Sequence, residues 1–186
     1  MSTRTLTAAI NTALSEDVVK PYYALKLDFD TTPIYLWTGL GNRILDGINT
    51  YQGVGNLLDI GRTNETSDLS AQGLVLTLSG VDPTILPKAL GVDYHGRDCF
   101  LYFGILDAND NPSQVEVFSG FMDVMVINED PESPTIELTV ESNYIKLERP
   151  NNTRYTASYQ KSIHAGDLGL DFVESLQDKT VLWGRV

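Results

Sequence analysis

Two carboxylates close together near the start of the chain have the type and spacing of a metal or acid–base site. Asp28 and Asp30 flank Phe29 and are followed by two threonines. Paired carboxylates are able to hold a cation or to share a proton. Acidic side chains are far commoner in turns, where they accept hydrogen bonds from nearby backbone N–H groups. We therefore interpret Asp28 and Asp30 as turn residues between two strands.

The run that begins at Asp107 has the first features of a calcium-binding loop. Asp107, Asn109 and Asn111 occupy alternate positions, as oxygen ligands do in such loops. Pro112 then stands where glycine is required, and Phe118 stands where a bidentate glutamate belongs. The segment is therefore predicted to be a hairpin turn and not a calcium site.

The other chemistry-bearing residues form no known catalytic pattern. His95 and His164 are far apart in the sequence and belong to no Ser/His/Asp or metal-ligand motif. The single cysteine, Cys99, lies in an apolar run and is predicted to be a buried core thiol. One cysteine excludes disulfides within the chain and cysteine-rich zinc or iron–sulfur sites. We expect no catalytic residue, no cofactor and no metal site, hence a protein that is not an enzyme.

Short alternating segments predict a mainly β fold. In the segment 74–79, three leucines alternate with Val75, Thr77 and Ser79, which is the period of a half-buried strand. The leucine face is predicted to lie in the core. The other face is available for a helix or a neighbouring subunit to cover. Similar segments, separated by turn residues such as Asp46-Gly47, give about eight strands, at 23–29, 34–37, 44–45, 48–51, 74–79, 97–106, 115–126 and 136–140. Gly120 is predicted to bend the segment 115–126. Their spacing is typical of an antiparallel β-sandwich or barrel with one or two short helices.

The sequence suggests three parts: a helical arm at 1–20, a β-sandwich or barrel domain at 21–150 and a C-terminal extension at 151–186. The arm can be capped by Ser2 or Thr3, carries apolar residues at helical spacing and is expected to dock on its own domain or on a neighbour. In the extension, Asp167 is predicted to cap a short helix. The extension is too short for a core of its own, so we expect an inter-subunit clamp. The interface candidates on these two terminal parts are Leu6, Ile10, Tyr155, Phe172, Leu176 and Trp183.

The chain carries a formal charge of −12 in 186 residues, and this charge is unevenly placed. Residues 151–186 contain four basic and four acidic residues, so the whole net charge lies in residues 1–150. Such an acidic body argues against sequence-specific binding of nucleic acid, although it suits a surface that lines a DNA passage without gripping it. The absence of a signal peptide and of any 18-residue apolar run predicts synthesis in a reducing cytoplasm and no membrane partner.

An ordered series of short motifs resembles the tail-tip proteins of long-tailed bacteriophages, prophages and gene transfer agents, which include the distal-tail and baseplate-hub components. The series runs from about Tyr23 to the C-terminus and comprises Tyr51-Gln-Gly-Val-Gly-Asn-Leu-Leu, Glu65-Thr-Ser-Asp-Leu-Ser-Ala-Gln-Gly, Leu76-Thr-Leu-Ser-Gly, Phe118-Ser-Gly-Phe-Met-Asp, Thr139-Val-Glu-Ser, Leu147-Glu-Arg-Pro, Arg154-Tyr-Thr, Ser175-Leu-Gln-Asp-Lys and Trp183-Gly.

The resemblance implies a fold of the tail-tube type and assembly as a ring, a trimer or a hexamer, at the tail tip of a virion. The implied partners are further copies of the chain, the tail tube and other baseplate proteins. Two other functions remain open. One is a carbohydrate-binding β-sandwich for host attachment, which requires exposed aromatic residues such as Tyr22, Trp37 or Tyr94. The other is a cell-wall hydrolase, which requires two carboxylates in a cleft.

Overall fold

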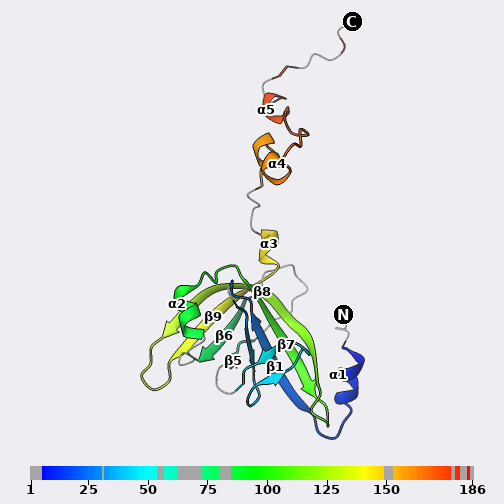
Figure 1. Cartoon of the computed structure of the whole chain (residues 1–186), viewed down its shortest axis with the longest axis vertical. Coiled ribbons are helices and arrows are strands. Elements are labelled where there is room, and N and C mark those ends of the chain that lie inside the picture. The colour runs from blue at the N-terminus through cyan, green and yellow to red at the C-terminus, as the bar shows by residue number, and fades with distance from the viewer. Residues whose placement is uncertain are drawn as a thin grey trace. The chain divides into compact units, whose positions relative to one another are not determined.

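A computed structural model describes residues 6–30, 32–53, 57–62, 73–79, 85–148, 153–176, 179–180 and 184, with all their side chains except those of Leu58 and Glu148. The chain divides into two units, which we call the sheet domain (Met1–Lys146) and the C-terminal unit (Leu147–Val186). All the strands among the described residues belong to the sheet domain, and the C-terminal unit contains short helices (Figure 1).

Seven strands form one antiparallel sheet in the order β2-β1-β7-β8-β9-β6-β5, and β3 and β4 form a small second sheet. This confirms the prediction of a mainly β protein. The described strands do not close a barrel, because β2 and β5 are the two edges of the large sheet. The elements are α1 (Ala8–Ala13), β1 (Lys20–Leu27), β2 (Ile34–Trp37), β3 (Arg43–Ile44), β4 (Thr50–Tyr51), β5 (Leu57–Ile60), β6 (Gly73–Ser79), α2 (Ile85–Gly91), β7 (Asp98–Leu106), β8 (Pro112–Asn128), β9 (Thr135–Ser142), α3 (Ile145–Glu148), α4 (Ala157–Ile163) and α5 (Val173–Leu176).

The main core lies on one face of the curved sheet. The alternation predicted for β6 is confirmed, since Leu74, Leu76 and Leu78 are all buried in this core. Side chains from both edge strands, such as Leu36 of β2 and Leu57 of β5, belong to the same buried cluster. The sheet is curved (Figure 1), so residues from both of its edges contribute to one core. Each fully buried leucine contributes about 1.5–3 kcal/mol of transfer free energy.

A second cluster lies on the opposite face of β1 and β2. The even-numbered residues Tyr22 and Ala24 pack there with Trp37, and Tyr51 comes from the β3–β4 hairpin. The rings of Tyr22 and Trp37 meet edge to face with centroids 6.0 Å apart. Burial raises the pKa of Tyr22 to about 12. The hairpin turn is held by Asp46, as predicted, with Gly47 at a φ of +81°.

The N-terminal helix α1 docks on its own sheet domain. The Thr7 side chain caps it by accepting a hydrogen bond from the backbone N–H of Ile10. Ile10 and Ala13, three residues apart, are buried against Ile105 of β7, and Leu6 packs against the same cluster. Of the two alternatives for the arm, the structure therefore shows docking on its own domain. Ser2 and Thr3, the predicted cap residues, lie outside the described residues.

The longest strand, β8, joins the two halves of the sheet. Its first part pairs with β7 and its second part with β9. The sequence predicted a bend at Gly120, but Gly120 lies inside one continuous strand of 17 residues. It is paired with Cys99 on one side and Ser142 on the other. A Cβ atom at this position would lie 2.1 Å from the backbone oxygen of Glu141, so only glycine allows this approach.

The structure predicts that Gly120→Ala destabilises the sheet domain strongly. Inserting one methyl group against rigid backbone costs about 1–3 kcal/mol in the free energy of unfolding, measurable by urea unfolding at pH 7. Gly73→Ala is the matched control, because its Cβ would lie 3.6 Å from the nearest atom, which is ordinary contact distance. Equal stability of the two variants would show that the close approach at Gly120 is not a constraint.

Candidate functional site

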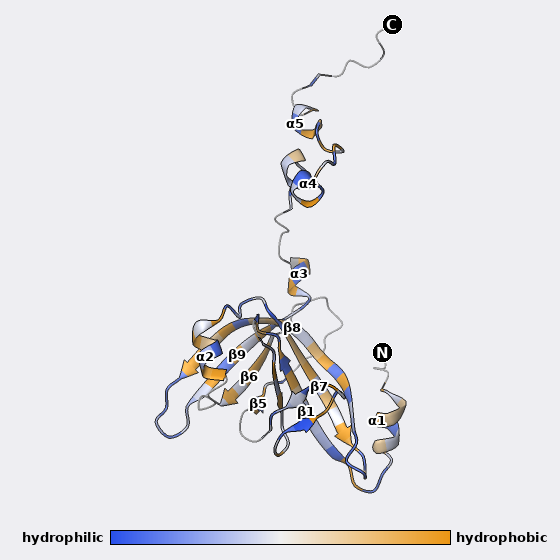
Figure 2. Ribbon diagram, viewed as in Figure 1, coloured by the Kyte–Doolittle hydropathy of each residue, from blue (hydrophilic) through white to orange (hydrophobic). Residues whose placement is uncertain are grey.

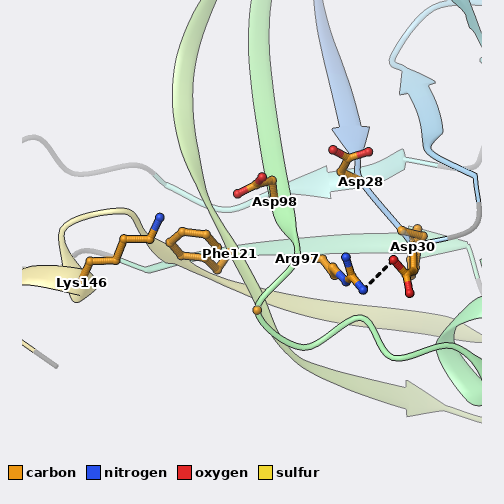
Figure 3. Close-up of a pocket in the computed structure, with 8 residues that line it drawn as sticks. Asp28, Asp30, Arg97, Asp98, Phe121 and Lys146 are labelled. Atoms are coloured by element: carbon orange, nitrogen blue, oxygen red, sulfur yellow. Dashed lines mark ion pairs between the residues drawn. The ribbon is translucent and has the colours of Figure 1, made fainter. Parts of the chain in front are cut away.

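Asp28 and Asp30, the two carboxylates considered for metal or acid–base chemistry, line a polar cleft together with Arg97 and Asp98. Asp28 and Asp30 follow β1, and Arg97 and Asp98 lie at the start of β7. The cleft has a volume of about 450 Å³ and is also lined by Phe121 and Lys146 (Figure 3). The backbone N–H of Asp28 donates to the carbonyl of Asp98 at 2.9 Å, so strand pairing brings these acids together. Neither Arg97 nor Asp98 stood out in the sequence.

Two ion pairs and one cation–π contact hold charged side chains of this cleft. Arg97 is paired with Asp30 at 2.6 Å (Figure 3), and Lys26 lies 3.5 Å from Asp28. The ammonium group of Lys146 lies over the Phe121 ring, 4.1 Å from its centroid. The described residues contain no group of three or more His, Cys, Asp or Glu side chains arranged to hold a metal ion. The cleft thus has the character of exposed ion pairs at the end of the sheet.

The supposed calcium loop is the predicted hairpin turn. One carboxylate oxygen of Asp107 accepts hydrogen bonds from the backbone N–H groups of Asn109 and Asn111, and the other accepts one from the Asn111 side chain. These bonds hold the pKa of Asp107 below its usual range, the side chain of Asn111 contributing most. The loop conformation is completed by Asp110, which has a φ of 63°. Asp107 thus serves as the hydrogen-bond acceptor that orders this turn.

Cys99 and His95 are placed as the sequence predicted. Cys99 is fully buried in the main core, and burial raises the pKa of its thiol, which disfavours the reactive thiolate. His95 is largely exposed, and its Nδ1 lies 3.0 Å from the backbone oxygen of Asp123. These residues provide no nucleophile and base in contact.

Two of the aromatic residues required by the carbohydrate-binding alternative are not available. Trp37 and Tyr22 are only 5% and 3% exposed, because the β3–β4 hairpin covers them. The Tyr94 side chain packs against the main core, and its hydroxyl accepts a hydrogen bond from the backbone N–H of Met125. The expectation of a face with these exposed aromatic rings is therefore wrong.

In the part of the C-terminal unit that the structure describes, no residue is buried and polar interactions order the turns. Neither α4 nor α5 contains a buried residue. Thr156 caps α4, the Gln160 side chain donates to Asp167 at 2.6 Å, and Lys161 is paired with Asp171 at 2.5 Å. The sequence predicted that Asp167 caps a helix, but it forms a turn by accepting a hydrogen bond from the backbone N–H of Gly169. Helix α4 itself was not predicted.

Several interface candidates of this unit are strongly exposed. Tyr155 is 85% exposed and Phe172 is 73% exposed. Leu176 donates its backbone N–H to the carbonyl of Phe172, so these two side chains lie one helical turn apart, on the same face. Figure 2 shows apolar and polar residues interspersed along this unit. Trp183 lies outside the described residues. These large apolar side chains are therefore exposed to solvent in the described part of the unit, and their role as interface residues stays a prediction.

The sheet domain has a second cleft with mixed polar and apolar lining, which we call the Tyr23 cleft. It has a volume of about 410 Å³, and its lining includes Tyr23, Ile60, Leu101, Phe103, Val117 and Arg62. The rings of Tyr23 and Phe103 meet edge to face at 5.5 Å, and Tyr23 remains 40% exposed. Ile105, the next residue on this face of β7, is covered by α1.

The face of β6 that carries Val75, Thr77 and Ser79 is only partly covered. Val75 is 46% exposed, whereas its neighbours Leu74 and Leu76 are buried. Val126 on β8 is also exposed. The structure therefore leaves this outer face accessible, and it does not show a covering layer over Val75.

The fold is that of a mainly β protein, and large apolar side chains are exposed on both of its units. Among solved structures, it is similar to a chain in "Virion of native gene transfer agent (GTA) particle", with a TM-score of 0.56 and 12% sequence identity. The match covers 81% of this chain and 49% of that chain, so this protein spans about half the length of its structural neighbour. At this identity the likeness shows a shared fold. No protein-family model and no curated protein matches the sequence.

No helix among the described residues is both long enough and apolar enough to cross a membrane.

The turn at Asp167 gives a pH-dependent prediction. Hydrogen bonds from Gly169 and Gln160 hold the pKa of Asp167 below its ordinary value of about 3.9. Its contribution to the stability of the turn is therefore present above the unfolded pKa and is lost as the pH falls through the lower folded pKa. The amide proton shift of Gly169, followed by NMR, should titrate with a midpoint below about 3.9.

Asp167→Asn is the control for this titration, because the amide cannot ionise. In that variant the Gly169 shift should no longer follow the same transition. A midpoint at or above the ordinary value in the wild-type chain would contradict the assigned hydrogen bonds.

Proposed function

We propose that this protein is a structural component of a siphophage-type tail tip. In this role it forms a ring, either the distal-tail ring or the baseplate hub, that connects the tail tube to the host-recognition apparatus and surrounds the DNA passage. The observation that carries the proposal is the shared fold with a chain of a gene transfer agent virion over 81% of this protein. The series of tail-tip-like motifs in the sequence supports it independently.

The surfaces of the chain support an assembly role. The C-terminal unit exposes large apolar side chains such as Tyr155, Phe172 and Leu176, and its helices contain no buried residue. Such a segment gains most of its stability when another surface covers it. We therefore propose that residues 151–186 act as an inter-subunit clamp. The partners are further copies of the chain, the tail tube and other tail-tip proteins, and the location is the tail tip of the virion.

The charge of the sheet domain suits a DNA passage. Residues Met1–Lys146 contain 8 basic and 20 acidic residues, which gives −12, whereas Leu147–Val186 contain 5 of each. The turn between β8 and β9 exposes Glu129, Asp130 and Glu132. In the proposed ring an acidic surface lines or rims the lumen, because like charge prevents DNA from binding to the wall. A non-catalytic role is part of the proposal.

The location is tested on the particle itself. An epitope-tagged copy, detected by gold-labelled antibody in electron micrographs, should place the label at the end of the tail. The tag belongs at the N-terminus, so that the clamp stays unmodified. Label on the capsid, or particles that lack the protein altogether, would contradict the proposed location.

The clamp is tested by truncation. A chain that lacks residues 151–186 should keep the β-sheet signal in its far-UV circular dichroism and lose only the contribution of α4 and α5, because the main core lies within the sheet domain. It should remain a monomer by sedimentation velocity under conditions in which the full chain forms a ring. Normal rings from the truncated chain would refute the clamp.

A further inference from the structure

The N-terminal arm is fastened to the sheet domain by a small set of side chains. Helix α1 places Ile10 and Ala13 against Ile105 of β7, and Leu6 packs against the same cluster. Helix α1 has 6 residues, whereas isolated helices shorter than about 12–15 residues are only marginally stable in water. The helix therefore depends on its docking, and loss of these few contacts is enough to release it.

A short exposed segment connects the arm to β1. Asp17, Val18 and Val19 are all exposed, and they form no backbone hydrogen bond with the other described residues. Such a segment can change its backbone dihedrals without breaking other interactions, as hinge residues do. Residues 17–19 are therefore suited to act as a hinge between α1 and the sheet.

Both sides of this hinge are fastened to the turn between β7 and β8. On the arm side, the Glu16 carboxylate accepts a hydrogen bond from the backbone N–H of Ala108 at 2.9 Å. On the strand side, Lys20 is paired with Asp110 at 2.8 Å. Lys20 is also the first residue of β1 and remains part of the sheet, so the bond of Glu16 is a contact that breaks when the arm lifts.

The surface beneath α1 continues into the Tyr23 cleft. Phe103 lines that cleft and also packs against the cluster beneath α1, together with Val115 of β8. We call Phe103, Ile105 and Val115 the apolar strip. Ile105 is fully buried while α1 is docked, so lifting the helix exposes it and extends the cleft along β7. The position of the arm thus sets how much of the apolar strip is accessible.

We propose that residues 6–16 form a strap over the apolar strip, which opens about residues 17–19 and has Glu16 as its clasp. The strap opens without unfolding of the sheet, because the ladder between β1 and β7 begins beyond the hinge, at Lys20. Local openings of this kind require less free energy than global unfolding. The inference concerns the single folded chain, so it does not depend on the proposed ring function.

Thiol labelling of the full chain tests the strap, because the single native cysteine supplies an internal reference. Ala13→Cys places a second thiol on the buried side of α1, whereas Cys99 lies in the main core. The introduced thiol should react with a soluble aromatic disulfide about a hundredfold faster than Cys99. Labelling at the rate of Cys99 would mean that α1 leaves only when the core opens. Labelling at the rate of an unprotected thiol would mean that α1 is never closed, and either result overturns the proposal.

The clasp is tested by substitution of Glu16 in the same background. Glu16→Ala should raise the labelling rate of the introduced thiol about fivefold, which corresponds to the loss of one hydrogen bond. Glu16→Gln keeps an acceptor oxygen and should restore most of the protection. Asp17→Ala is the matched control, since it removes the same charge from an exposed side chain that has no hydrogen bond or ion pair with the described residues. Equal labelling rates in Glu16→Ala and Asp17→Ala overturn the role of Glu16.

Hydrogen exchange provides a second measurement that needs no introduced thiol. The backbone N–H of Leu14 donates to the carbonyl of Ile10 at 2.9 Å, and this bond is lost when α1 lifts and unwinds. The Leu14 amide should exchange faster than the amides of β7, and Glu16→Ala should accelerate it by the same factor as the thiol labelling. A Leu14 amide that exchanges only as fast as the β7 amides overturns the strap, whatever Ala13→Cys does to the packing.

Discussion

The close approach between β8 and β9 at Gly120 is the constraint on which the sheet depends. Gly120 is paired with residues of both neighbouring strands, and no side chain fits between it and the backbone of Glu141. Strand β8 can therefore continue from its partner β7 to its partner β9 without interruption. The two halves of the sheet, β2-β1-β7 and β9-β6-β5, share one core because this strand joins them. Because side chains alternate along β7 and β1, each strand presents apolar residues on both of its faces. Helix α1 packs on such residues of β7, and the β3–β4 hairpin packs on such residues of β1.

The two units of the chain use different sources of stability. The sheet domain buries continuous apolar clusters and keeps its acidic residues outside, in turns and exposed ion pairs. The C-terminal unit orders its turns with hydrogen bonds and an ion pair and leaves its large apolar groups exposed. This division is the basis of the proposed assembly. In that proposal the sheet domain forms the body of each subunit, and the C-terminal unit, in which no described residue is buried, forms the contact between subunits.

Local patterns in the sequence predicted the strands well, because the period of two and the turn residues act over a few positions. The alternation in β6, the Asp46-Gly47 turn and the Asp107 turn are all found in the structure. Strand β5 was missed, since Leu57–Ile60 is short and depends on pairing with the distant strand β6. Of the polar cleft, the sequence pointed to Asp28 and Asp30 but not to Arg97, because Arg97 contacts Asp30 only through the pairing of β1 with β7. Burial of Trp37 and Tyr22 was likewise invisible, since it depends on a hairpin that folds over the outer face of the sheet.

In the proposed tail-tip role, the buried position of Cys99 matters once the particle has left the cell. The thiol is fully enclosed in the main core, and burial raises its pKa, so the nucleophilic form needed for oxidation is scarcely present. Because this is the only cysteine of the chain, copies brought close together have no accessible sulfur with which to cross-link. A change from a reducing interior to an oxidising medium therefore leaves the Cys99 thiol of the folded protein unaltered. The contacts of the proposed ring then carry no disulfide between copies and remain reversible.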